Sequence, residues 1–386
     1  MYLCSAKALL SQLKLNVMVQ RIDIKPEMLA WAIQRAGYDV NVYLSEHPDV
    51  EAWYNQEKQP TEKQLEDFAK KIHIPYGYLF LNEPSQEEVP IPMFRGSAGD
   101  GGFNLNVYDT VLSVQRRQEW LTDYLTENEY DVCSCVGIIT LQTPLTDTVR
   151  VLRHLLQLDE DWAFVRRDPS DAVNFLTEHI EELGIAVSFN SGVDNNNRRE
   201  IPVEECRGFA LVNNVAPFIF VNNKDSKTAQ LFTLIHETTH ILLGTSAGFG
   251  GDMDKIHDVT ERYCDKAAAA FLMPADLVRS SWHGISQTAK KFKVSELAMA
   301  RRAHELHLIS REEYRSFYQD YQNRPIPVKK SSSFGDFYAT ATKRVGRLLA
   351  VHIVNAVKSR QLDYLQAYRL TGMYGNTYQT FVNKLI

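Results

Sequence analysis

The feature that most restricts the fold is a proline-free run, KTAQLFTLIHETTHILLG at residues 227–244, with two histidines four positions apart. Its apolar residues recur with the period of a helix, and Gly244 is a typical helix stop. We therefore predict a helix that ends at Gly244. On a helix, His236 and His240 lie one turn apart on the same face, where both imidazoles can bind one metal ion.

The residues around this pair predict a hydrolytic metal site. Glu237 completes an H-E-x-x-H pattern, in which the glutamate takes a proton from a metal-activated water. Glu261 lies on a second predicted helix, VTERYCDKAAAAFLM, which stops at Pro274. Its carboxylate would be a third protein ligand and leave a fourth position for water, the arrangement of a catalytic Zn²⁺ site. Asp265, one turn further on, can orient His236 or His240 through the free ring nitrogen.

The chain as a whole has an α+β pattern that is mostly helical. Its 386 residues exceed one ordinary core, so several domains are expected. Short β-rich runs (IAVSF, GFALV, FIFVN) precede the histidine helix and predict a small, mostly antiparallel sheet. The predicted divisions are a helical N-terminal bundle at 1–95, a helical connector at 96–169, a zinc-site domain at 170–325 and a C-terminal helical region at 326–386.

Composition and net charge limit the partners and the cellular compartment that we expect for this chain. The net charge is -6, so no global positive field attracts the chain to nucleic acid or anionic lipid. We find no secretion signal and no apolar run that could span a bilayer, so we expect a cytoplasmic protein without membrane contact. Its five cysteines are odd in number and show no disulfide framework. Cys133 and Cys135 are one residue too close for the usual C-x-x-C spacing, and we expect a structural role for them.

The segment H-E-T-T-H, followed by E-R-Y-C-D-K-A-A-A-A-F-L-M-P, resembles the ImmA/IrrE family of minimal gluzincin-type metallopeptidases over roughly residues 170–310. The resemblance implies that His236, His240 and Glu261 bind zinc and that Glu237 is the catalytic base. Two positions depart from the common family pattern: Tyr263 stands where a second glutamate is usual, and Cys264 where alanine is usual.

The N-terminal stretch from MLAWAIQRAG to IHIPYGYLFL resembles the helix-turn-helix module of XRE-type repressors, which is often fused ahead of this peptidase. The combination implies regulatory proteolysis of a repressor or toxin, on a mobile element or a toxin–antitoxin-like operon. Charge argues against DNA as the main partner, because residues 1–95 contain more acidic than basic side chains. The segment in the position of a recognition helix carries Asp49, Glu51 and Glu57. We favour a protein-binding or dimerising role and keep DNA contact as the alternative.

Other interpretations stay open at this point. The two histidines can be ordinary helix residues, or the site can bind zinc without catalysing hydrolysis. In the second case the chain would be a non-catalytic antitoxin or transcriptional regulator that binds a toxin or DNA and uses the peptidase fold as a scaffold. Asp265 can be a simple surface carboxylate. His257, Tyr263 and His283 are weaker candidates for stabilising an oxyanion, and each is more often a packing residue.

Overall fold

The computed structural model describes residues 21–85, 104–196, 198–249, 258–324 and 336–385. The described residues form two compact units, with the division near residue 105. Each unit has its own apolar core and is considered separately below.

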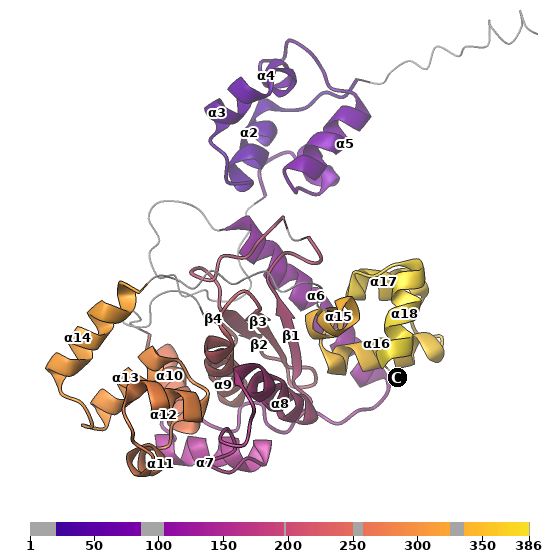
Figure 1. The fold of residues 1–386 in the computed structure, drawn as a ribbon. Coiled ribbons are helices and arrows are strands. Elements are labelled where there is room, and N and C mark those ends of the chain that lie inside the picture. Colours follow the sequence, from indigo (N-terminus) through magenta and orange to yellow (C-terminus); the bar gives the residue numbers. More distant parts are fainter. Residues whose placement is uncertain (1–20, 86–103, 197, 250–257, 325–335, 386) are drawn as a thin grey trace, which may run out of the picture. The chain divides into compact units, whose positions relative to one another are not determined.

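The first unit consists of four short helices and a 3-10 turn around one core (Figure 1). Its elements are α2 (Pro26–Arg35), α3 (Val40–Glu46), α4 (Pro48–Tyr54), α5 (Glu62–Lys71) and η1 (Tyr76–Phe80). Local chemistry sets their starts, because Asp39 caps α3, Pro48 opens α4 and Thr61 forms a capping box with Gln64 on α5. The described residues of this region are therefore helical, as expected from the sequence.

A four-stranded sheet is the centre of the second unit. Its strands are β1 (Ala186–Asn190), β2 (Gly208–Leu211), β3 (Phe218–Asn222) and β4 (Ala247–Phe249), in the spatial order β1-β3-β2-β4. The β2–β3 and β2–β4 pairs are antiparallel, as expected, but β1 and β3 are parallel. The small, mostly antiparallel sheet expected from the sequence is therefore present, and the parallel β1–β3 pair makes it a mixed one. After β1, the connection at 191–207 passes the position next to β1 and leads into β2. Strand β2 runs opposite to β1, and β3 then returns between the two, so β3 runs in the direction of β1.

Helices cover both faces of this sheet, which explains why strands β1, β2 and β3 are buried on each side. Val187, Phe189, Ile219 and Val221 belong to the core that the sheet shares with α8 (Pro169–Glu182) and α9 (Lys227–Leu243). The alternate side chains point to the second face, where α6 (Leu105–Glu127) packs behind the sheet in Figure 1. From α6, the Gln118 amide donates hydrogen bonds to the carbonyls of Leu211 and Ala216.

The other helices of the second unit surround this centre. They are α7 (Leu145–Leu156), α10 (Val259–Leu272), α11 (Ala275–Ser280), α12 (Ile285–Phe292), α13 (Glu296–Glu305), α14 (Arg311–Gln322), α15 (Phe337–Val345), α16 (Arg347–Lys358), α17 (Tyr364–Thr371) and α18 (Gly375–Leu385). Helix α10 packs against α9 and α7, whereas α15 and α16 pack against β1. The mostly helical α+β fold class expected from the sequence is confirmed, and the division into four domains stays a prediction.

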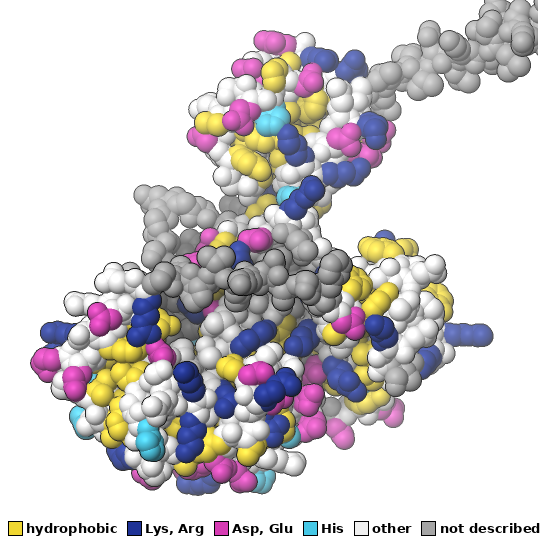
Figure 2. Space-filling model, viewed as in Figure 1, with side chains coloured by type: hydrophobic (Ala, Val, Ile, Leu, Met, Phe, Trp, Pro, Cys, Tyr) yellow, Lys and Arg dark blue, Asp and Glu magenta, His cyan; other side chains and the backbone are white. Residues whose placement is uncertain are grey.

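Two observations concern the surface. Figure 2 shows Lys and Arg side chains interspersed with Asp and Glu side chains on the visible face of each unit. Such mixing agrees with the small net charge of the sequence. Within the described ranges, no helix is both long and apolar enough to cross a bilayer.

Candidate metal centre

Helix α9 carries the two histidines in its C-terminal half, within the core of the second unit. Ser226 caps its start by accepting a hydrogen bond from the amide of Ala229. Gly244 ends it in the left-handed conformation, with φ of 71°. All five residues from His236 to His240 have an exposed fraction of 0%. The predicted helix and its stop at Gly244 are both present, and the motif lies where water has little access.

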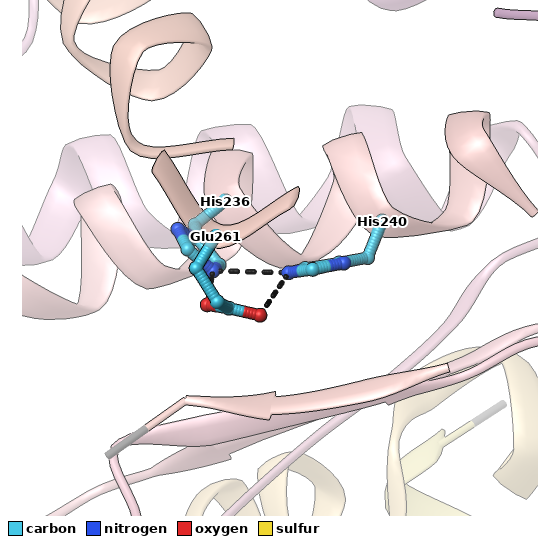
Figure 3. A group of neighbouring side chains, drawn as sticks. All are labelled: His236, His240 and Glu261. Carbon is cyan, nitrogen blue, oxygen red and sulfur yellow. Dashed lines mark hydrogen bonds and ion pairs between the residues drawn. The ribbon is translucent and has the colours of Figure 1, made fainter. Parts of the chain in front are cut away.

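Three side chains converge beside α9 (Figure 3). The Nε2 atoms of His236 and His240 are 3.1 Å apart. The Glu261 carboxylate reaches both rings, with Oε2 at 3.1 Å from His236 Nε2 and Oε1 at 3.1 Å from His240 Nε2. One nitrogen from each ring and a carboxylate oxygen lie within 4.8 Å of one another. The structure therefore brings together the three residues predicted from the sequence to be metal ligands.

The first turn of α10 places Glu261. Asp258 caps this helix by accepting hydrogen bonds from the amides of Thr260 and Glu261, which fixes where the helix begins. Further along α10, the small side chains of Ala267 and Ala268 are fully buried. Small residues allow a helix to approach its neighbour closely, so α10 can bring a carboxylate within reach of the rings on α9.

Asp265 fixes the orientation of one histidine. Its Oδ1 lies 3.0 Å from His236 Nδ1. When Nε2 of His236 binds a metal ion, the ring proton lies on Nδ1, where Asp265 can accept it, and this contact holds the ring with Nε2 toward His240 and Glu261. A longer contact of 3.4 Å joins His240 Nδ1 to the Thr245 hydroxyl. Asp265 thus contacts a predicted ligand, as expected, and Thr245 is a contact that the sequence pattern did not reveal.

The pKa values at the site reflect burial together with close carboxylates. Burial lowers the pKa of His236, but hydrogen bonds to Asp265 and Glu261 outweigh it and raise that pKa to about 10. For Glu261, burial opposes ionisation, yet the two histidines hold its pKa at about 2. Burial lowers the pKa of His240. Burial also raises the pKa of Glu237 well above its usual range.

The donor set suits a divalent cation. As metal ligands both imidazoles would be neutral, and a divalent cation would then compensate the buried negative charge of Glu261. Two imidazoles and one carboxylate are typical ligands of a catalytic zinc ion. Ligands at about 2.0–2.1 Å in a tetrahedron would be about 3.4 Å apart. The observed separations of 3.1 Å are close to that value.

Glu237 lies beside this cluster, and among the described residues its buried side chain lacks the hydrogen bonds that a buried carboxylate usually has. Neither of its oxygens has a hydrogen-bond partner in the described part of the chain, although both are inaccessible. Such a group costs folding free energy, so its presence calls for a functional explanation. Strand β2 approaches it at Gly208, where an added Cβ would lie 3.5 Å from Glu237 Oε1 and 2.5 Å from Thr233 Cγ2. Gly208 is a second residue that the sequence analysis did not single out, because its role appears only when strand and helix meet.

The weaker candidates for oxyanion stabilisation lie elsewhere. The Tyr263 hydroxyl donates to the carbonyl of Thr143 and lies 2.5 Å from the Thr148 hydroxyl, so it attaches α10 to α7. The His283 ring contacts the carbonyl of Ser281. His257 lies outside the described residues. The structure thus gives Tyr263 a packing role and does not bring His283 into the cluster of His236, His240 and Glu261.

Comparison with known families agrees with this geometry. Residues 180–304 match the IrrE N-terminal-like domain of the Peptidase_M78 family, and this range includes the histidine cluster, Glu237 and Asp265. Residues 345–384 match a domain of unknown function (DUF8813). No curated protein matches the chain. The chain therefore contains an M78 metallopeptidase-like domain with a buried His-His-Glu group suited to a metal ion. The roles of the individual residues stay predictions.

Proposed function

We propose that the protein is a zinc-dependent endopeptidase that cleaves one specific partner protein in a regulatory circuit. The observation that carries this proposal is the buried, unpartnered carboxylate of Glu237 beside the convergent His236, His240 and Glu261. A purely structural zinc site has four protein ligands and needs no base next to it. The group here offers three ligands and one adjacent carboxylate.

In the proposed reaction, His236, His240 and Glu261 hold the zinc ion, and Asp265 keeps the His236 ring in its ligand orientation. When bound, zinc would polarise the scissile carbonyl and lower the pKa of a coordinated water. Glu237 accepts the proton of the attacking water on a carboxylate oxygen and then passes it to the leaving amine. Burial of Glu237 favours this transfer, because few solvent molecules compete for the proton.

The sheet supports a peptide as the substrate. Strand β4 is at one end of the strand order and follows directly after the histidine helix. Among the described strands, none pairs with the outer edge of β4. An extended peptide can add to such an edge through main-chain hydrogen bonds, which would place a peptide bond beside the cluster.

For the first unit we propose recognition of the partner. The family resemblance suggests an XRE-type helix-turn-helix arrangement, with α4 in the position of the recognition helix. Asp49 and Glu51 on α4 are exposed, and Glu57 just after it is exposed as well. Carboxylates in this position would repel phosphates, so a protein partner such as a repressor or toxin, or a second copy of this chain, is favoured over DNA. The free cysteines of the described residues are in keeping with a cytoplasmic setting.

The test compares the full-length chain with Glu237→Gln and with Glu178→Gln, which changes an exposed carboxylate on α8. Each form is purified for metal analysis and is also co-expressed with each repressor-like or toxin-like protein whose gene neighbours its own. We expect about one zinc per chain in all three forms, and cleavage of the partner by the parent chain and Glu178→Gln only.

The other outcomes have distinct meanings. If zinc is bound and the partner is held intact by both the parent chain and Glu237→Gln, the protein is a non-catalytic regulator on a peptidase fold. If no metal co-purifies and none binds on addition, the assignment of His236, His240 and Glu261 as ligands is wrong.

A further inference from the structure

Two cysteine thiols are held together in a turn outside the metal centre. The Sγ atoms of Cys133 and Cys135 are 3.2 Å apart. The amide of Val136 donates to the carbonyl of Cys133 at 3.3 Å, which closes a turn around Ser134 and Cys135. Without such a turn, side chains two positions apart in an extended segment would point the same way but remain well separated. The turn therefore brings two sulfur atoms into contact.

The surroundings hold the turn in place from both sides. On one side, the Cys133 amide donates to the carbonyl of Asn214 at 2.8 Å, and the Cys133 thiol to that of Leu183 at 3.2 Å. On the other side, the amides of Gly137 and Ile139 donate to the last carbonyls of α9, at Ile241 and Leu242. These bonds tie the segment to the helix that carries His236 and His240. The contact between the thiols is thus part of the packed fold.

The two sulfur atoms differ in access and acidity. Cys133 is partly buried, whereas Cys135 has an exposed fraction of only 1%. The hydrogen bond from the Cys135 thiol lowers the pKa of Cys133 to about 7. The same contact and burial raise the pKa of Cys135. An accessible, acidic thiol next to a buried one is the arrangement of an attacking and a resolving cysteine.

We propose that Cys133 and Cys135 form a reversible thiol–disulfide site that reacts with small-molecule disulfides of the glutathione type. The Cys133 thiolate attacks one sulfur of the small disulfide, which forms a mixed disulfide and releases one thiol. The Cys135 thiolate then attacks the Cys133 sulfur, which forms the Cys133–Cys135 bond and releases the second thiol. Two protein thiols are oxidised, one small disulfide is reduced to two thiols, and the two cysteine protons pass to the released sulfurs.

The geometry requires only a local change for this reaction. The two sulfur atoms must move from 3.2 Å to a bond length of about 2.05 Å. The sequence spacing alone favoured a structural role for these cysteines, since it is shorter than the C-x-x-C pattern. The turn and the sulfur contact, which only the fold reveals, change that interpretation.

The experiment uses the full-length chain with Cys4→Ser, because Cys4 lies outside the described residues. The protein is treated with glutathione disulfide, free thiols are alkylated, and the peptides are identified by mass spectrometry. We expect the peptide with Cys133 and Cys135 to lose two hydrogens, to resist alkylation and to recover both thiols with a dithiol reductant. Cys206 and Cys264, which are both fully buried, should stay reduced and are internal controls.

Two variants test the order of attack. Cys135→Ser should stop at the mixed disulfide and retain one glutathione per chain at Cys133, whereas Cys133→Ser should retain almost none. The proposal is overturned if the peptide of the parent chain stays reduced, if glutathione remains on it, or if its oxidation links two chains. The measurement on the parent chain decides the question even if one serine variant fails to fold.

Discussion

Strand β2 lies so close to helix α9 at Gly208 that this residue is a sharp test of the packing. Replacing it with alanine would put a Cβ 2.5 Å from Thr233 Cγ2 and 2.8 Å from the carbonyl oxygen of Phe220. Ordinary contacts of this kind are 3.4–4 Å, so α9 and β2 must separate by about 1 Å. Thr233 is 1% exposed and has little room to move. Overpacking of this kind costs about 2 kcal/mol of unfolding free energy.

Hydrogen exchange followed by mass spectrometry suits this prediction, because it resolves peptides from each compact unit. A loss of about 2 kcal/mol corresponds to roughly 30-fold faster exchange for amides in β2 and α9 that open together with the core. Adding Thr233→Ser to Gly208→Ala removes the closest methyl group and should restore part of the protection. Full recovery is not expected, because the Phe220 carbonyl remains.

Gly77→Ala is the matched control, since a Cβ there would meet nothing within 4 Å. It should leave exchange in β2 and α9 unchanged. The packing argument is refuted if Gly208→Ala exchanges at the parent rate in these two elements, or if Thr233→Ser gives no recovery.

Three further predictions concern the metal centre and the attachment of the C-terminal helices. Asp265→Asn should weaken zinc binding by about 10–100-fold in competition with a chelator, because His236 loses its orienting carboxylate, whereas the exposed Asp276→Asn should not. Stripping zinc should speed hydrogen exchange in α9 and α10, and no change would show that zinc does not bridge these helices. Burial raises the pKa of Glu181 to about 7. The folded state therefore binds a proton that the unfolded state has already lost between pH 4.5 and 7. The free energy of unfolding should fall by about 3 kcal/mol as pH rises through this range. Glu181→Gln should remove this pH dependence in denaturant titrations.

The parts of the site that depend on helical period could be predicted from the sequence. The pairing of His236 with His240 follows from one turn of helix, and Glu261 and Asp265 are one turn apart on the next helix for the same reason. Gly244 as a helix stop is also a local property, because glycine accepts the left-handed conformation at low cost. These features needed no knowledge of which strand pairs with which.

Features that arise between distant segments could not be predicted in this way. The parallel pairing of β1 with β3 depends on where the 191–207 connection crosses, and strand composition does not encode that path. Gly208 looks like any strand-end glycine until α9 packs against it. Likewise, Cys133 and Cys135 become a pair only because a turn brings their sulfur atoms together.

The two outer strands of the sheet, β1 and β4, have different surroundings, and this difference bears on where a peptide could add to the sheet. At β1, the outward-facing amide of Val187 donates to the Glu181 carboxylate, which also accepts from Leu348 at the start of α16. Gly346 adopts φ of 89° there, and a Cβ at this position would meet the Val187 carbonyl oxygen at 2.6 Å. Helices α15 and α16 therefore occupy this edge tightly, and a peptide could not add to it without displacing them. Strand β4 is the opposite edge, and it follows the helix of His236 and His240 directly. If the protein is the peptidase proposed above, an extended substrate would add at β4, the strand that pairs with β2 at Gly208, close to Glu237.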